Sequence, residues 1–129
     1  MRIPKSIVLV DDDRDDHEIF RSACAQVDHR VHVLGFDSGD QAIRNLSVMP
    51  SLPDVIFLDL NMPRLNGVDV LEKLKDSAQL KSVPVVIYST SFDSTVREKC
   101  SSLGAIEIME KPSCFDALCT RLQTVLHSL

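Results

Sequence analysis

Short apolar runs alternate along this chain with longer stretches in which apolar residues recur at helical spacing. The runs are rich in β-branched side chains, which is typical of strands buried on both faces of a parallel sheet. Five strands are predicted, over residues 6–10, 31–36, 55–58, 85–88 and 105–109. Their alternation with helical stretches predicts a doubly wound α/β domain, in which helices cover both faces of a five-stranded parallel sheet.

Five helical stretches follow the strands, and each repeats apolar residues at intervals of three and four. The clearest apolar faces consist of Ile19, Phe20, Ala23, Cys24 and Val27 in the first stretch, Val70, Leu71 and Leu74 in the third, and Phe115, Leu118, Cys119, Leu122, Val125 and Leu126 in the fifth. Ser38 with Gln41, and more weakly Ser113 with Asp116, have capping-box spacing, which predicts helix starts. The fourth helix, expected over about residues 93–102, is less apolar and should be partly exposed.

The 129 residues match the size of one domain, with 44% hydrophobic and 26% charged residues as in an average globular protein. No repeat or linker interrupts the chain, so we predict a single domain over residues 1–129 with no output domain. The net charge is −5 and the 14 Lys and Arg residues are scattered. Binding to nucleic acid needs clustered basic residues and is therefore not predicted.

Neither a membrane span nor a secretory signal is visible in the sequence. No stretch approaches the roughly 18 consecutive apolar residues of a spanning helix, and the N-terminal apolar run meets three Asp residues instead of a cleavage site. We therefore expect a cytoplasmic protein with no membrane contact. Its four cysteines include no C-x-x-C pair, which favours reduced, buried thiols over a zinc site or disulfides.

Polar side chains stand directly after four of the five predicted strands. They are Asp11, Asp12 and Asp13 after the first, Asp59 after the third, Ser89 and Thr90 after the fourth, and Lys111 after the fifth. The carboxyl ends of parallel strands meet at one edge of the sheet, where ligands of this fold class bind. Carboxylates brought together there repel one another, so a divalent cation is expected, and Mg²⁺ is the favoured one.

Part of the acidic cluster has a simpler interpretation. Asp13, Asp15 and Asp16 lie near the start of the first helix, where acids stabilise the helix dipole, and we interpret them in that way.

An EF-hand calcium loop is a second alternative for these acids. Asp11, Asp13 and Asp15 match the first three ligand positions of that loop. That motif fails, because Asp16 replaces the required Gly and Ser22 replaces the required Glu.

In combination, these segments resemble the receiver domain of two-component response regulators. The resemblance rests on VLVDDD, on LDLNMP with Gly67 shortly after it, on VPVVIYS and on EKP, each at a strand end and in this order, from Ile7 to the last helix. It implies a flavodoxin-like fold with strand order 2-1-3-4-5. It also implies that Asp59 is a phosphoacceptor rather than part of a classical enzyme, taking its phosphoryl group from a histidine kinase or a histidine phosphotransfer protein.

The resemblance also assigns roles to the residues around Asp59. Asp12 would bind Mg²⁺ directly, Asp11 would assist through water, and Asn61 would offer its backbone carbonyl beside Asp59. Ser89 matches the family's switch hydroxyl, which turns inward to hydrogen-bond the phosphoryl group. Lys111 matches the lysine that pairs with that group, and the bond from Lys111 to Pro112 is often cis in this family.

Two positions depart from the family pattern. The residue after the switch hydroxyl is usually small, often Ala or Gly, and this chain has Thr90, which would narrow access to Asp59. Three residues before Lys111 the family usually has Tyr or Phe, whose rotation accompanies that of the switch hydroxyl, and this chain has Ile108. Tyr88, one residue before Ser89, is the candidate to replace part of the aromatic signal. Phosphorylation should then change the surface formed by the fourth helix, fifth strand and fifth helix, which a target protein or a homodimer would use.

Two other functions stay open at this point. A degenerate receiver would act as an unphosphorylated interaction module, which Ile108 and Thr90 motivate. An Asp-dependent phosphohydrolase acting on small phosphoesters is disfavoured, because it needs a second Asp two residues after its nucleophile and this chain has Asn61.

Overall fold

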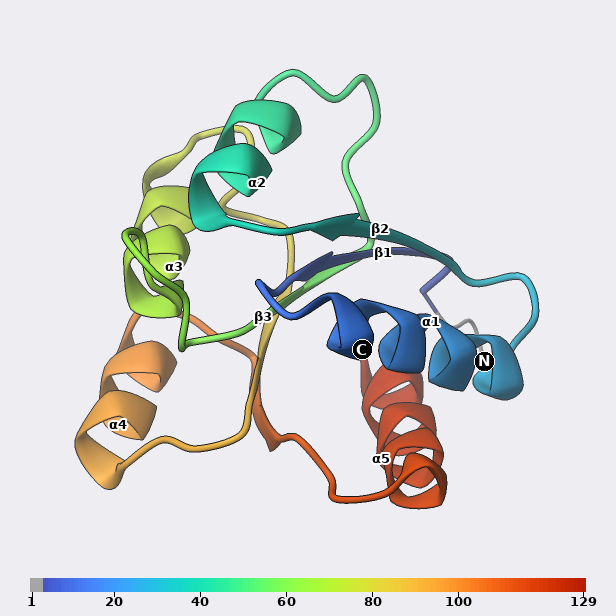
Figure 1. Cartoon of the computed structure of the whole chain (residues 1–129). Helices are drawn as coiled ribbons and strands as arrows, with labels where there is room; N and C mark the ends of the chain where they lie inside the picture. The colour runs from blue at the N-terminus through green and yellow to red at the C-terminus, as the bar shows by residue number, and fades with distance from the viewer. Residues whose placement is uncertain (1–3) are drawn as a thin grey trace.

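The computed structural model describes residues 4–129, so the first three residues of the predicted domain lie outside it. Its five parallel strands form one sheet in the order β2-β1-β3-β4-β5 (Figure 1). The strands are β1 (Ser6–Val10), β2 (His32–Phe36), β3 (Val55–Leu58), β4 (Val85–Ser89) and β5 (Glu107–Glu110). The helices are α1 (Arg14–Val27), α2 (Gly39–Leu46), α3 (Gly67–Asp76), α4 (Ser94–Ser102) and α5 (Phe115–Ser128). The predicted doubly wound, flavodoxin-like α/β fold is confirmed.

Two apolar layers sandwich the sheet, as the continuous apolar strands predict. Helices α1 and α5 cover one face, and α2, α3 and α4 cover the other (Figure 1). Successive side chains of a strand point to opposite faces, so Ile7 and Leu9 of β1 pack beneath α1 and α5, whereas Val8 and Val10 pack beneath the other three helices. The two cores together fix the sheet from both sides.

Three predicted strands differ from the observed ones by one or two residues. β2 begins after Val31, because the N–H of Val31 donates to the carbonyl of Asp28 in a turn. β5 begins later than predicted, because the N–H of Ala105 donates to Cys100 and closes the last turn of α4. β4 extends through Ser89, whose carbonyl accepts from the N–H of Lys111 at 2.9 Å.

Of the two helix starts predicted from capping-box spacing, the one at Ser38 is correct and the one at Ser113 is wrong. The hydroxyl of Ser38 accepts from the N–H of Gln41 at 3.1 Å, which confirms Ser38 as the predicted helix start, and the side chain of Gln41 accepts from the N–H of Asp37 at 2.8 Å. The prediction for Ser113 is wrong, because α5 has Cys114 at its N-cap, without a side-chain cap, and Ser113 falls one residue outside. The predicted fourth helix is confirmed, with Asp93 as its cap and Cys100 as its one buried residue.

The four cysteines are free thiols. Cys24 and Cys100 are buried, and burial raises the pKa of the Cys24 thiol to about 12. The prediction of buried thiols is wrong for Cys114, which is exposed because it caps α5 instead of joining its apolar face. Within residues 4–129, no helix combines the length and the apolar character that crossing a membrane requires.

Gly67 fixes the position of the loop that follows β3. Its N–H donates to the carbonyl of Leu60 at 3.1 Å, so the first turn of α3 sits directly on this loop. A Cβ atom at Gly67 would lie 2.3 Å from the carbonyl oxygen of Asp59 and 2.6 Å from the Cα of Leu60. Both are backbone atoms that cannot turn away, so only glycine allows this close approach.

Gly67→Ala should therefore destabilise the fold even though alanine is the better helix former. The added methyl group pushes against backbone on two sides, and we expect a loss of about 1 to 3 kcal/mol in the free energy of unfolding, measured by urea denaturation. Ser101→Ala, at an exposed position of α4, is the control and should change stability by less than about 0.5 kcal/mol. Equal stability of the two variants would contradict the backbone contact.

Candidate functional site

The side chains predicted to meet at the carboxyl edge of the sheet do meet there. Asp11 and Ser89 are fully buried and Asp59 is 5% exposed. The N–H of Asp59 donates to the carbonyl of Val10 at 2.9 Å, which places the end of β3 beside the end of β1. The hydrogen bond between Lys111 and Ser89 likewise places the residue after β5 beside the end of β4.

Three carboxylates form the centre of this site. Asp11, Asp12 and Asp59 each offer an oxygen within 4.8 Å of the others, and among the described residues no other such group is found. Asp11 and Asp59 are buried, whereas Asp12 is exposed and can reach a hydrated ion. Clustered carboxylate oxygens that include one open to water suit a hard divalent cation, so these residues fit a metal site.

Lys111 brings a positive charge into the same cluster. Its ammonium lies 2.7 Å from Oδ2 of Asp11, 2.7 Å from Oδ2 of Asp16 and 3.7 Å from Oδ2 of Asp59. The ring of Tyr88 lies below it, with the centroid 5.2 Å from Nζ. Burial alone would lower the pKa of Lys111, but the hydrogen bonds to Asp11 and Asp16 outweigh it and raise the pKa above its usual value.

Asp11 shows what the burial of a carboxylate costs at this edge. Desolvation raises its pKa from the ordinary 3.8 to about 6. The hydrogen bonds from Lys111 and from the N–H of Asp13 act in the opposite direction and offset only part of this effect. Lys111 therefore offsets the cost of burying the ionised Asp11 only in part, and a bound cation would offset more of it.

Ser89 and Asn61 connect Asp59 to the loop before α4. The N–H of Asn61 donates to Oδ1 of Asp59 at 3.3 Å, and its side-chain amide donates to Oγ of Ser89 at 3.1 Å. The Ser89 hydroxyl in turn donates to the carbonyl of Ser91 at 3.4 Å. Ser89 is thus held by the side chain of Asn61 from one loop and by the backbone of Ser91 from another.

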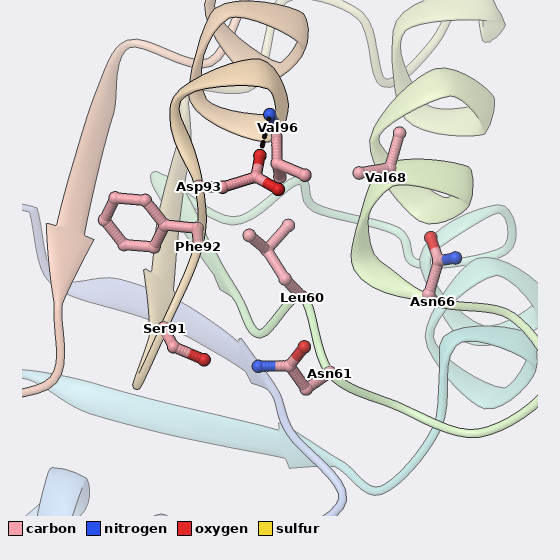
Figure 2. A pocket seen from close by; sticks show the side chains of 8 residues that line it. All are labelled: Leu60, Asn61, Asn66, Val68, Ser91, Phe92, Asp93 and Val96. Carbon is pink, nitrogen blue, oxygen red and sulfur yellow. Dashed lines mark hydrogen bonds between the residues drawn. The ribbon is translucent and has the colours of Figure 1, made fainter.

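A pocket of about 550 Å³ lies beside these residues, between α3 and α4. Figure 2 shows Leu60 in the middle of the pocket, with Val96 of α4 above it and Val68 of α3 to the right, Asn61 and Ser91 below, and the ring of Phe92 directed to the left. The remaining lining residues are Asn66 and Asp93, which cap α3 and α4. The pocket therefore borders both the site and the start of α4.

Two residues of this edge were missed in the sequence. Asp16 was interpreted as an acid that stabilises the helix dipole, but its carboxylate also pairs with Lys111, 95 residues away. Asp13 does act as the α1 N-cap and accepts from the N–H of Asp15 at 2.9 Å. The pairing of Asp16 depends on how α1 is placed against the end of β5, and the local sequence carries no signal for it.

His17 is the second missed residue. Its Nε2 donates to the backbone carbonyl of Asp11 at 2.7 Å, and the side chain is buried against β2. A Cβ atom at Gly35 would lie 2.3 Å from Nδ1 of His17, so this glycine makes room for the ring. His17 thereby fixes the backbone from which the Asp11 carboxylate projects.

Tyr88 does not replace the missing aromatic at position 108. Its ring packs with Phe20 and Phe57 in the core beneath α1 and α5, with centroid distances of 5.3 and 6.2 Å. Ile108 packs against the opposite core, beneath α2, α3 and α4. Tyr88 therefore does not occupy the place of the missing ring, because it lies beside Met109 of β5, whose side chain is on the opposite face of the sheet from that of Ile108.

The bond between Lys111 and Pro112 differs from the family expectation of a cis bond. The described residues contain no cis peptide bond, so this bond is trans.

Comparisons with known proteins agree with this geometry. The family model described as the response regulator receiver domain matches residues 7–123. Two rice proteins, the two-component response regulators ORR7 and ORR5 of Oryza sativa subsp. japonica, are each 33% identical over 106 and 119 residues. The matches cover 82% and 90% of this chain, which spans about half (49%) of ORR7 and 87% of ORR5.

A solved structure is similar over almost the whole chain. It is the phosphorylated cyanobacterial phytochrome response regulator RcpA, with 28% sequence identity and a TM-score of 0.86. The match covers 95% of this chain and 91% of RcpA.

Stability should depend on pH through Asp11. Its raised pKa means that the folded protein keeps a proton that the unfolded chain has released, so the ionised form of Asp11 opposes folding. In the presence of a chelator, the free energy of unfolding should fall by about 1 to 3 kcal/mol through this group as the pH rises from about 4 to about 7.

Asp11→Asn is the matched control, because the amide cannot ionise. Urea denaturation should give the two proteins similar stability near pH 4 and a more stable variant near pH 7. A stability difference that stays constant between these two pH values would contradict the assignment.

Proposed function

This chain belongs to the response regulator receiver domain family, and from that membership we propose that it is a phosphoacceptor that takes a phosphoryl group onto Asp59. Members of the family are phosphorylated rather than acting as classical enzymes, and a two-component response regulator implies a histidine kinase partner. One observation carries the proposal: a buried carboxylate stands at a sheet edge between two further acids and a lysine that is 8% exposed.

The reaction follows from the chemistry of these groups. An oxygen of the Asp59 carboxylate attacks the phosphorus of a phosphohistidine on the partner, the new P–O bond forms, and the P–N bond breaks as the imidazole leaves. The transition state is loose, and its charge rests on the peripheral oxygens of the phosphoryl group. The ammonium of Lys111, 3.7 Å from Oδ2 of Asp59, is placed to neutralise that charge.

The acid cluster suits Mg²⁺ as the cofactor. Asp11, Asp12 and Asp59, with the backbone carbonyl of Asn61, would hold the ion, and the presence of one lysine beside these carboxylates supports a further cation. When bound, the ion supplies positive charge to the oxygens of the phosphoryl group and of the carboxylates. Asn61 also argues against the phosphohydrolase alternative, which needs an acid at this position.

The phosphorylated state would be signalled through Ser89 and α4. The Ser89 hydroxyl is held by Asn61 on one side and by the carbonyl of Ser91 on the other, so a phosphoryl group on Asp59 offers it a competing acceptor. Ser91 leads through Phe92 into α4. We propose that this loop changes the surface of α4, β5 and α5 and so the affinity for a target protein or a second copy of the chain.

Incubation with acetyl phosphate and Mg²⁺ tests the acceptor. Intact-mass spectrometry should show the gain of one phosphoryl group on the unmodified chain, no gain for Asp59→Asn, and no gain in excess chelator. Asp40→Asn, an exposed position on α2, is the control and should behave like the unmodified chain. No gain on the unmodified chain would favour the degenerate receiver instead.

Backbone amide NMR tests the route through Ser89. Phosphorylation should shift resonances across residues 97–118 as well as those near Asp59. Ser89→Ala should still accept the phosphoryl group, but its shifts over residues 97–118 should be reduced by at least about half, because the hydroxyl that senses the group is gone. Ser102→Ala, exposed at the end of α4, should keep the full shifts. Shifts confined to the neighbourhood of Asp59 in the unmodified chain would rule out this route.

A further inference from the structure

The ammonium of Lys111 has a second close carboxylate partner, on a helix that holds none of the residues proposed to bind the cation. We propose that Asp16 is a positioning residue that anchors Lys111 toward α1 before phosphorylation and competes with the phosphoryl group on Asp59 for the ammonium. The inference rests on the proposed function of Asp59 and deepens it, because it names a residue that would set how readily Asp59 gains its phosphoryl group and how long it keeps it.

The distances show that Lys111 is shared unequally. Asp11 and Asp16 each lie 2.7 Å from its nitrogen, which is the length of a strong charge-assisted hydrogen bond, whereas Asp59 lies at 3.7 Å. An ammonium has three N–H donors, and two are already used by these short contacts. The phosphoryl group must therefore draw on the third donor or take one from an existing partner.

Burial indicates which partner Lys111 can leave. The Asp11 side chain is fully buried, so losing its cation would strand a charge away from water. The Asp16 side chain is 26% exposed and borders a pocket of about 370 Å³ that is also lined by Tyr88, Thr90 and Lys111. Water can therefore solvate Asp16 when the ammonium moves away, and Asp16 is the partner that gives way.

The position of Asp16 on α1 lowers the cost of that release. Asp16 stands in the first turn of the helix, where the free N–H groups and the dipole stabilise a negative charge. The helix start therefore offsets part of the cost when Lys111 leaves this carboxylate. The same negative charge, close to Lys111, reduces the positive potential that the ammonium offers to phosphoryl oxygens.

The proposal predicts the direction in which loss of the Asp16 charge changes the rates of phosphorylation and of phosphoryl loss. Removing the charge of Asp16 should make Lys111 more available to Asp59, so that phosphorylation by acetyl phosphate becomes faster and the loss of the phosphoryl group becomes slower. We expect changes of about threefold to tenfold in each, because the contact combines a strong hydrogen bond with a partly exposed charge.

The experiment compares Asp16→Asn with Asp15→Asn in the full chain. Asp15 is an exposed acid in the same turn, so its variant removes the same charge from the same helix end without touching Lys111. Initial rates and phosphoryl lifetimes are measured by mass spectrometry with acetyl phosphate and Mg²⁺. Asp16→Glu, which keeps the charge, should return both values toward those of the unmodified chain.

A second measurement needs neither metal nor phosphate. Acetic anhydride acylates lysines through their neutral amine, and peptide mass spectrometry reports the rate at each lysine. Lys111 should react about threefold to tenfold faster in Asp16→Asn than in Asp15→Asn, because the hydrogen bond that holds its nitrogen against α1 is lost. The exposed Lys99 should react equally in both variants and serves as the internal reference.

These readouts separate the two ideas. If the unmodified chain is not phosphorylated, the function proposed for Asp59 fails, and the reactivity of Lys111 still decides whether Asp16 anchors the ammonium. The proposal that Asp16 anchors Lys111 is overturned if the chain is phosphorylated and Asp16→Asn matches Asp15→Asn in phosphorylation rate, in phosphoryl lifetime and in the acylation rate of Lys111. Slower phosphorylation of Asp16→Asn than of Asp15→Asn would also overturn it, since Asp16 would then assist the reaction instead of competing with it.

Discussion

The contact between Lys111 and the carboxylates at the sheet edge is the interaction on which the site depends. Asp11 and Asp59 are almost fully removed from water, and a buried carboxylate is tolerated only with a partner. Lys111 supplies one positive charge to three carboxylates: its nitrogen lies 2.7 Å from Asp11, 2.7 Å from Asp16 and 3.7 Å from Asp59. One lysine faces three carboxylates, so the group fits a divalent cation, and burial raises the pKa of Asp11 in spite of the lysine.

The rest of the fold holds these charges at fixed distances. Strand ladder bonds join the ends of β1 and β3 and of β4 and β5, and two apolar layers prevent the sheet from relaxing away from the repulsion. Gly67 lets α3 pack directly on the backbone of Asp59, and His17 holds the carbonyl of Asp11. Gly67 and His17 take no part in the proposed reaction, but they fix the backbone positions of Asp59 and Asp11.

The sequence was sufficient for the parts of the site that follow from topology. Ser89 ends β4, and Asp11, Asp59 and Lys111 directly follow their strands; parallel strands bring their carboxyl ends to one edge, so the proximity of these residues was predicted correctly. Contacts that depend on the placement of a helix could not be predicted in this way.

Asp16 faces Lys111 only because α1 docks beside the end of β5, and its local sequence indicates no more than a helix start. The helix start predicted at Ser113 is wrong by one residue, because capping-box spacing alone does not determine at which residue α5 begins.

The position of Phe92 bears on how a receiver without an aromatic at position 108 would transmit its state. Tyr88 lies on the wrong face of the sheet, but Phe92 packs against the core beneath α4, three residues after Ser89. Arg97 of α4 lies over its ring, 5.4 Å from the centroid. Hydrogen bonds run from Asp59 through Asn61 and Ser89 to Ser91, the residue before Phe92. In the proposed signalling route, a shift of the Ser89 hydroxyl would reach α4 through this loop, and the segment that precedes α4 would replace the missing aromatic residue of β5.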